Sequence, residues 1–365
     1  MKGKKTLLIS CFIVILLSSN SISNVSFAYV ESNIEFGGNI IAFDQYHGGY
    51  HSTDIDDIVS NLTFAGNQVL LINDVWDLPD ETDSLILTCA DVGEPWLTSQ
   101  IDDIVNWLDL GNKLLWVSGD SDYGGFFNPN PINNVLNASG ALVRLDGTSI
   151  SDTVSNDGAE YRIAAKDFGV GDPFYDTEIV NNLTKDMSAG AIFHGPCSIL
   201  AYDGYQYRSL RYGDSIFPDR IWTILRFSEN ATSADTDISD NELDLYANIA
   251  ETGNYPALVY EYLTEKNSHV IISGEAIYSD YQRMYSQKTA SGVYNGGHHF
   301  GQVLVNNIFN NFLEDKEFPT PTPTPTPSTT ETPTPSPTTI DMYFSVTVFT
   351  LSIITLVIIR SKKKS

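Results

Sequence analysis

Strands and helices alternate through residues 38–145, and this alternation restricts the possible fold more than any other feature of the chain. Continuous apolar runs, typical of strands covered on both faces, occur at 40–43, 69–72, 85–87 and 114–117. Apolar residues with helical spacing lie between them, at Ile55, Ile58, Val59 and Leu62 and again at Ile101, Ile104, Val105 and Leu108. Gly66 and Gly111 follow these segments, where a helix commonly ends on a left-handed glycine. The pattern predicts a doubly wound, mostly parallel sheet with helices on both faces.

The remainder of the globular part divides in two. Residues 255–314 return to the same pattern, with strands at 257–260 and 270–272 and a closing helix whose apolar face carries Val305, Ile308, Phe309 and Phe312. Residues 146–254 hold short apolar runs among turn residues and predict a β-rich elaboration of the main sheet, with a separate small domain as the alternative. We expect one α/β domain over residues 29–318, with its core at 38–145 and 255–314.

The two ends of the chain predict membrane attachment. Residues 1–28 combine three lysines, a short apolar run and the small-x-small sequence Ser26-Phe27-Ala28, which indicates a signal peptide; an uncleaved anchor is the alternative. Residues 319–339 are rich in Thr-Pro repeats and predict an extended, disordered stalk. Residues 340–359 are apolar and long enough to cross a bilayer, and the basic residues 360–365 then form a cytoplasmic tail. We expect a single-pass protein of the cell membrane with an extracellular domain.

The charge of the chain limits the classes of partner that it can bind. The net charge is −26, and seven of the 20 Lys and Arg residues lie in the predicted signal and tail, so the domain between them is more acidic still. Nucleic acid is excluded as a partner because like charges repel. An extracellular glycan, small molecule or envelope protein remains open, together with the lipid bilayer around the C-terminal helix.

Cysteines and glycosylation sequons fit an extracellular location. Cys89 and Cys197 remain after removal of the signal, and they either pair or stay as two buried thiols. Four Asn-x-Ser/Thr sequons begin at Asn61, Asn137, Asn182 and Asn230. A secreted chain can carry glycans at those that are exposed.

Polar residues follow the predicted strands at the ends where open α/β sheets bind ligands. The candidate ligand-binding residues are Asp44, His47, His51, Asp91, Asp120, Asp122, Tyr123, His194 and Glu275. Turn formation and helix capping are the alternative roles for any one acidic residue among them.

Two kinds of chemistry are open for this set. Ser121, in Gly119-Asp120-Ser121-Asp122, stands where a strand meets a turn, and with a histidine such as His47 it is a candidate nucleophile. However, loop residues rather than a helix follow Ser121. Asp44, His47, Asp120 and Asp122 are the candidate ligands of a divalent metal, since carboxylates and imidazole bind Ca²⁺, Mg²⁺, Zn²⁺ or Mn²⁺.

The stretches IIAFDQYHGGY, VLLIND, DSLILTCADVGEPWLTSQIDDIVNWLDLGNKLLWVSGDSDYGG and GGHHFGQVLVNNIFNNFL resemble the class I glutamine-amidotransferase-like superfamily. The similarity is greatest to its divergent members of unknown function, as in transporter-associated, gliding-motility and intraflagellar-transport proteins. It covers residues 38–145 and, more loosely, 255–314, and it implies a flavodoxin-like or amidotransferase-like fold. An active amidotransferase has a cysteine after the strand that ends here at Gly119, and a late His-x-Glu; this chain has neither. The resemblance therefore implies the fold without the chemistry.

Three functions follow as expectations. The first is a surface protein whose catalytically degenerate domain binds a ligand or partner. The second is a metal-assisted or serine-dependent hydrolase of cell-surface glycan or peptide, and the third is a structural component of the envelope. The tyrosines of residues 202–212, interspersed with Asp and Arg, offer a possible sugar-binding face, or else they are half-buried edge-strand residues.

Overall fold

The computed structural model describes residues 38–47, 55–88, 95–123, 127–168, 190–211, 220–236, 252–277, 284–285 and 301–313. The chain divides into two compact units, Met1–Pro321 and Thr322–Ser365, and every described residue belongs to the first. The predicted signal peptide, stalk, transmembrane helix and tail lie outside the described residues. Within the described residues, none of the helices is both long and apolar enough to cross a membrane.

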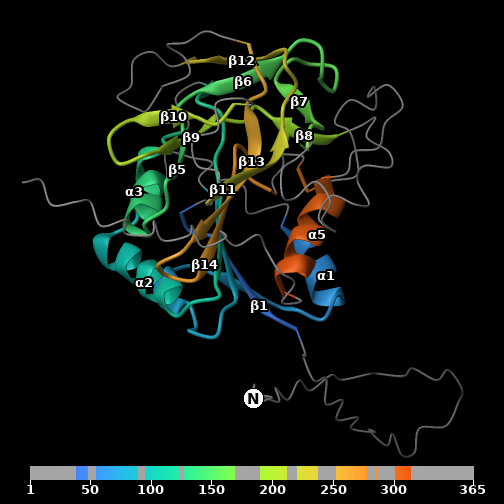
Figure 1. Ribbon diagram of the computed structural model, residues 1–365. Helices are drawn as coiled ribbons and strands as arrows, with labels where there is room; N and C mark the ends of the chain where they lie inside the picture. Colours follow the sequence, from blue (N-terminus) through green and yellow to red (C-terminus); the bar gives the residue numbers. More distant parts are fainter. Residues whose placement is uncertain are drawn as a thin grey trace, which may run out of the picture. The chain divides into compact units, whose positions relative to one another are not determined.

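A seven-stranded sheet forms the centre of the domain, in the order β11-β13-β14-β4-β3-β1-β2 (Figure 1). Its strands are β1 (Ile40–Asp44), β2 (Gln68–Ile72), β3 (Ser84–Thr88), β4 (Leu114–Ser118), β11 (Ile221–Arg226), β13 (Pro256–Leu263) and β14 (Ser268–Ser273). The strands β2, β1, β3, β4 and β14 pair in parallel. The predicted α/β domain with a mostly parallel sheet is confirmed.

The sheet is mixed, because β13 runs antiparallel to both of its neighbours. The turn from Leu263 to Ser268 is the cause: Lys266 N donates to Leu263 O at 3.0 Å, and Asn267 takes a positive φ of 49°. A connection this short joins antiparallel strands, whereas parallel strands require a long crossover.

Helices cover both faces of the sheet. They are α1 (Asp56–Phe64), α2 (Thr98–Asp109), α3 (Asn130–Ala138) and α5 (Gly301–Leu313), with a 3₁₀ turn η2 (Val75–Asp77) after β2. Buried residues of α1 and α5 pack in one hydrophobic cluster, and those of α2 and α3 pack in the cluster on the opposite face. Gly66 and Gly111 have φ of 92° and 77°, which confirms that α1 and α2 end on left-handed glycines.

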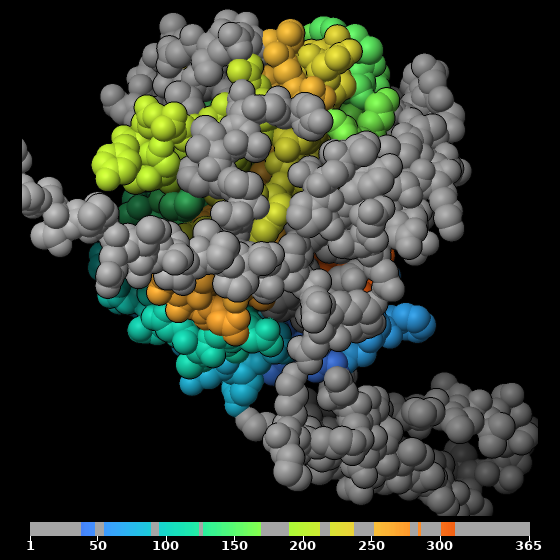
Figure 2. Space-filling view, viewed as in Figure 1, coloured from blue at the N-terminus to red at the C-terminus, as the bar shows by residue number. Residues whose placement is uncertain are grey.

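Small sheets make up the β-rich elaboration. They consist of β10-β9-β5, β12-β6 and β7-β8, formed by β5 (Val143–Leu145), β6 (Ser149–Asp152), β7 (Arg162–Ala165), β8 (Ala191–His194), β9 (Ile199–Tyr202), β10 (Tyr207–Ser209) and β12 (Ala231–Ala234). The β9–β10 hairpin is at the surface, yellow-green at the left of Figure 2. In contrast, β11 from the same part of the sequence pairs with β13 and extends the main sheet.

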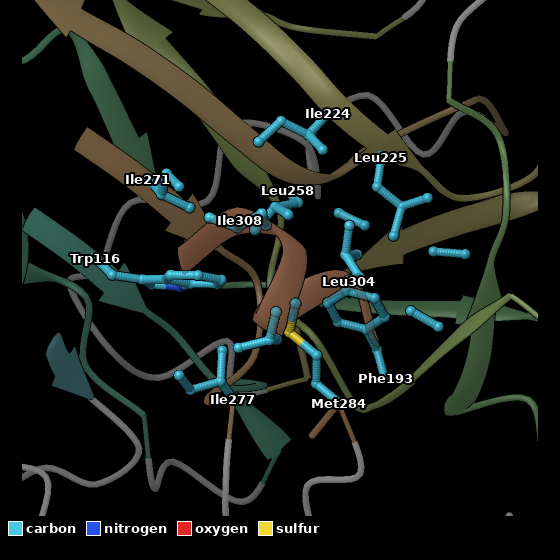
Figure 3. Packing of buried hydrophobic residues seen from close by; sticks show 14 of the residues in the cluster. Trp116, Phe193, Ile224, Leu225, Leu258, Ile271, Ile277, Met284, Leu304 and Ile308 are labelled. Atoms are coloured by element: carbon cyan, nitrogen blue, oxygen red, sulfur yellow. The ribbon is translucent and has the colours of Figure 1, made fainter. Parts of the chain in front are cut away.

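The larger cluster joins the sheet, α5 and the elaboration. Trp116 of β4, Ile271 of β14 and Ile308 of α5 are fully buried in it, together with Phe193 of β8 and Leu225 of β11 (Figure 3). The elaboration is therefore packed on the α/β core through shared apolar burial, which is the main stabilising contribution in a domain of this kind.

Candidate functional site

The strand register brings the carboxyl ends of four parallel strands to one edge of the sheet, which we call the carboxyl edge. Thr88 of β3 is opposite Ser118 of β4, and Ser118 is opposite Ser273 of β14. Phe43 of β1 is opposite Ile86 of β3, so the residues that follow β1 come to the same edge. Ligands of open α/β sheets bind beyond such an edge.

Asp44 and His47 form a buried pair at this edge. The Asp44 Oδ2 to His47 Nδ1 distance is 2.7 Å, and Asp44 Oδ1 accepts a hydrogen bond from Tyr46 N at 3.0 Å. Both carboxylate oxygens are thus occupied, and the tight turn of residues 44–47 fixes the imidazole. A carboxylate on Nδ1 favours the tautomer with the proton there, so that Nε2 is left to bind or accept.

Trp96 completes this arrangement. Its ring stacks on His47 with centroids 4.5 Å apart and an interplanar angle of 19°, while Tyr46 contacts the imidazole edge-on at 5.1 Å. Gln100 at the start of α2 sets the position of this segment, since its Oε1 accepts from Leu97 N and its Nε2 donates to Asp74 Oδ1. Sequence reasoning missed Trp96, although its place in the connection between β3 and α2 was a usable signal.

Three polar atoms close to this edge are buried without a hydrogen-bond partner among the described residues. They are Gln45 Nε2, Thr88 Oγ1 and Trp96 Nε1. A buried polar group left unsatisfied costs about 1–3 kcal/mol, and native proteins keep few of them. Gln45 directly follows Asp44, Thr88 ends the adjacent strand, and Trp96 stacks on His47. These atoms are available to a ligand or to ordered water.

Three more residues of interest, Glu275, His194 and Ser121, come together near the ends of β14, β8 and β4. Glu275, buried after β14, accepts a hydrogen bond at Oε2 from the backbone amide of His194 at 2.6 Å. The His194 ring lies edge-on to Tyr161, with centroids 5.1 Å apart. A β-carbon added at Gly195 would lie 3.2 Å from Ser121 Oγ, so the loop after β4 touches the end of β8.

Ser121 takes part in a turn. Its backbone amide donates to Asp120 Oδ1 at 2.7 Å, and its Oγ accepts from Tyr123 N at 3.4 Å. Among the described residues, no hydrogen bond joins Ser121 Oγ to a histidine ring. Tyr123 is largely exposed.

Asp122 has a role inside the fold. It is fully buried, and its carboxylate accepts hydrogen bonds from Ser149 Oγ, from Thr236 Oγ1 at 2.7 Å and from Thr236 N at 2.6 Å. It thereby holds the loop after β4 against β6 and the end of β12. His51 and Asp91 lie outside the described residues.

The four candidate metal ligands do not form one cluster. Across the described part of the chain, no three His, Cys, Asp or Glu side chains are arranged to hold a metal ion. Asp44 and His47 pair with each other, and Asp122 is committed to Ser149 and Thr236. A metal at the carboxyl edge stays a prediction.

The sequons differ in their surroundings. Asn61 of α1 donates from Nδ2 to Tyr285 OH at 3.1 Å, and Asn137 of α3 accepts from Arg144 Nη2 at 3.0 Å. Asn230 is exposed in the turn before β12. Asn182 and Cys89 lie outside the described residues, whereas Cys197 is buried.

Comparison with known proteins adds two structural similarities. No protein-family model matches the chain, and no curated protein sequence matches it. The mmIFT52 N-terminal domain is similar with a TM-score of 0.45 and 9% sequence identity, over 77% of this chain and 99% of that domain. A ThuA-like protein from Bacteroides uniformis has a TM-score of 0.37 and 11% identity, over 76% and 92% of the two chains. Both similarities concern the fold.

Proposed function

We propose that this chain is a membrane-anchored cell-surface protein whose amidotransferase-like domain binds a ligand at the carboxyl edge and lacks amidotransferase chemistry. The single observation that carries the proposal is the buried Asp44–His47 pair stacked on Trp96, whose indole N–H has no partner in the described part of the chain. The signal, stalk and anchor predicted from the sequence supply the surface location.

The polar atoms at the edge define the chemistry of the ligand. Trp96 Nε1 and Gln45 Nε2 are donors, Thr88 Oγ1 both donates and accepts, and His47 Nε2 accepts in the tautomer that Asp44 favours. Among the described residues named here, none is a lysine or an arginine that would bind an anionic ligand. We therefore infer a small uncharged molecule with carbonyl or hydroxyl oxygens and an apolar face that contacts the aromatic rings, such as a sugar or an amide.

The test compares two tryptophans. The full-length chain, in a detergent without a sugar head group, is screened by saturation-transfer NMR against neutral monosaccharides and small amides, and native mass spectrometry detects any co-purified molecule. Trp96→Phe keeps an aromatic ring but removes the available N–H, so we expect ligand affinity to fall about tenfold or more. Trp107→Phe is the matched control, because Trp107 Nε1 already donates to Thr82 O at 3.0 Å. Equal binding by wild type and Trp96→Phe would contradict the proposal.

A hydrolase is the second candidate, and the Asp44–His47 pair itself favours it. A carboxylate on Nδ1 and an imidazole with its Nε2 available form the orienter and base of many hydrolases. The base would activate water or a nucleophile on the facing loops. Hydrolysis of p-nitrophenyl esters or glycosides that disappears in both His47→Ala and Asp44→Asn would favour this candidate over binding alone.

A further inference from the structure

A separate surface of the elaboration displays tyrosine rings. The β9–β10 hairpin carries Tyr202 and Tyr207 as a cross-strand pair with ring centroids 5.0 Å apart, and Tyr205 at its tip. Tyr205 is 93% exposed and Tyr207 is 40% exposed. The hairpin is visible as the yellow-green surface at the left of Figure 2.

The turn that presents Tyr205 is fixed by one carboxylate. Asp203 Oδ1 accepts hydrogen bonds from Tyr205 N and from Gln206 N, both at 2.8 Å, and Oδ2 accepts from Arg208 Nε at 2.7 Å. Backbone donation from Gln206 is the main cause that lowers the pKa of Asp203, followed by the Arg208 hydrogen bond. Tyr202 OH donates to Gly204 O at 3.1 Å, and Gly204 has a φ of 92°, which suits glycine.

The opposite side of this small sheet is anchored in the core. Ile199 and Ala201 of β9, with Val143 and Leu145 of β5, are fully buried in the cluster on the α2–α3 face. Arg144 of β5 is opposite Leu200 and so lies on the same face as the Tyr202–Tyr207 pair. It is buried, and its guanidinium donates to Ala141 O, Val143 O and Asn137 Oδ1. The tyrosines therefore stand on a rigid support, and binding to them loses little conformational entropy.

We propose that the β9–β10 hairpin binds a neutral oligosaccharide through Tyr202, Tyr205 and Tyr207. Aromatic faces stack on the apolar faces of pyranose rings, and the phenol hydroxyls of the tyrosines hydrogen-bond to sugar hydroxyls. The net charge of −26 disfavours anionic polysaccharides.

The size of the platform favours a sugar over a protein partner. Three fully exposed tyrosines would offer at most about 750 Å², at roughly 150–250 Å² for each side chain. Tyr207 is only 40% exposed, so the three tyrosines present less than this area. A stable protein interface buries about 800 Å² on each partner and involves about 20–30 residues. The platform matches two or three sugar rings, and it lies on elements other than those that form the carboxyl edge.

Isothermal titration of the full-length chain with maltopentaose and with chitotetraose, again in a detergent without a sugar head group, tests the proposal. We expect at least one to bind, and Tyr205→Ala to weaken that binding by about tenfold or more. Tyr205 is almost fully exposed, so its replacement leaves the fold intact. Phe64→Ala is the matched control, because Phe64, at the end of α1, is a 95% exposed aromatic residue outside the hairpin and outside the carboxyl edge. Its binding is expected to equal that of wild type.

His47→Ala separates this site from the carboxyl edge. Unchanged oligosaccharide binding in His47→Ala supports the hairpin site whether or not the carboxyl edge binds a ligand. Binding lost in His47→Ala and retained in Tyr205→Ala would overturn the hairpin proposal, as would the absence of binding by both oligosaccharides. A concentration-dependent dimer abolished by Tyr205→Ala, without sugar binding, would overturn it in favour of a second copy of the chain.

Discussion

Gly119 lies directly against the sulfur of Cys197: a β-carbon added at position 119 would be 2.5 Å from Cys197 Sγ, and 3.1 Å from a methyl group of Leu145. Gly119 and Cys197 are far apart in the sequence, but each forms a backbone hydrogen bond to the end of β14. Gly119 N donates to Ser273 O, and Cys197 N donates to Gly274 O at 2.8 Å. The end of β4, the end of β14 and the elaboration thus meet where only glycine fits.

Replacement of Gly119 tests this contact. We expect Gly119→Ala to lower the free energy of unfolding by about 1–3 kcal/mol, because the added methyl group forces a buried neighbour to move. Cys197→Ala removes the sulfur and is expected to recover part of that loss in the double variant. Urea unfolding of the wild type, both single variants and the double variant gives the coupling energy. Strictly additive effects would show that the sulfur is not the obstacle.

The two tryptophan variants of the binding test are also expected to differ in their free energy of unfolding. Trp107→Phe loses an internal hydrogen bond and leaves Thr82 O to the Lys113 ammonium alone, so we expect a loss of about 1–2 kcal/mol beyond that of Trp96→Phe. Trp96→Phe breaks no hydrogen bond with described residues. Thermal unfolding without added ligand measures the difference. A larger loss in Trp96→Phe would indicate that its N–H already has a strong partner.

The sequence predicted the parallel core because the signal there is local. Continuous apolar runs at 40–43 and 114–117 and helical spacing in α1 and α2 depend on a few neighbouring residues. Strands buried on both faces are typical of a parallel sheet covered by helices. The reversal of β13 was missed for a specific reason. The sequence predicts strands at 257–260 and 270–272. In the structure β13 extends to Leu263 and β14 begins at Ser268, so that only a hairpin turn separates the two strands. The lengths of short strands depend on partners that the local pattern does not contain.

The candidate site was likewise predictable only where its residues lie close together in the sequence. Asp44 and His47 lie three residues apart, so the sequence already placed them on one turn, and the structure shows their pairing. The surroundings of Asp122 depend on Ser149 and Thr236, which come from the elaboration and were not foreseeable from the loop itself. Trp96 was not predictable from the polar residues that follow the strands, because its contribution is an aromatic ring on which His47 stacks.

Glu261 provides a test of how the elaboration is attached to the main sheet. Its carboxylate is fully buried on β13 and accepts from Leu142 N, from Val143 N and from Arg220 Nη2 at 2.7 Å. Burial raises the pKa of Glu261, and Arg220 with the two amides opposes that rise. Glu261→Gln turns an amide group toward these donors, so we expect a loss of about 2–4 kcal/mol in urea unfolding.

Glu265→Gln is the matched control for Glu261→Gln. Glu265 is exposed in the turn of the same hairpin, and its replacement is expected to change the unfolding free energy by less than about 0.5 kcal/mol. Similar losses in both variants would mean that the buried carboxylate does not anchor the connection between α3 and β5.

His269 gives the domain a predictable sensitivity to acid. Burial lowers the pKa of His269 to about 4, from an ordinary value of 6.5, and its Nδ1 lies 2.8 Å from Tyr260 OH. Burial also raises the pKa of Tyr260, so the phenol stays protonated and donates to the neutral imidazole. Because the unfolded chain takes up a proton at higher pH than the folded one, this contribution to stability is complete above pH 6.5 and is lost as the pH falls toward 4.

Between pH 7 and pH 4 we expect the wild type to lose about 3 kcal/mol more unfolding free energy than His269→Gln, which keeps an acceptor but does not titrate. Urea unfolding of both chains at several pH values isolates the histidine from the carboxylates, which titrate alike in both. Parallel pH profiles would show that His269 takes up its proton equally well in the folded and unfolded chains.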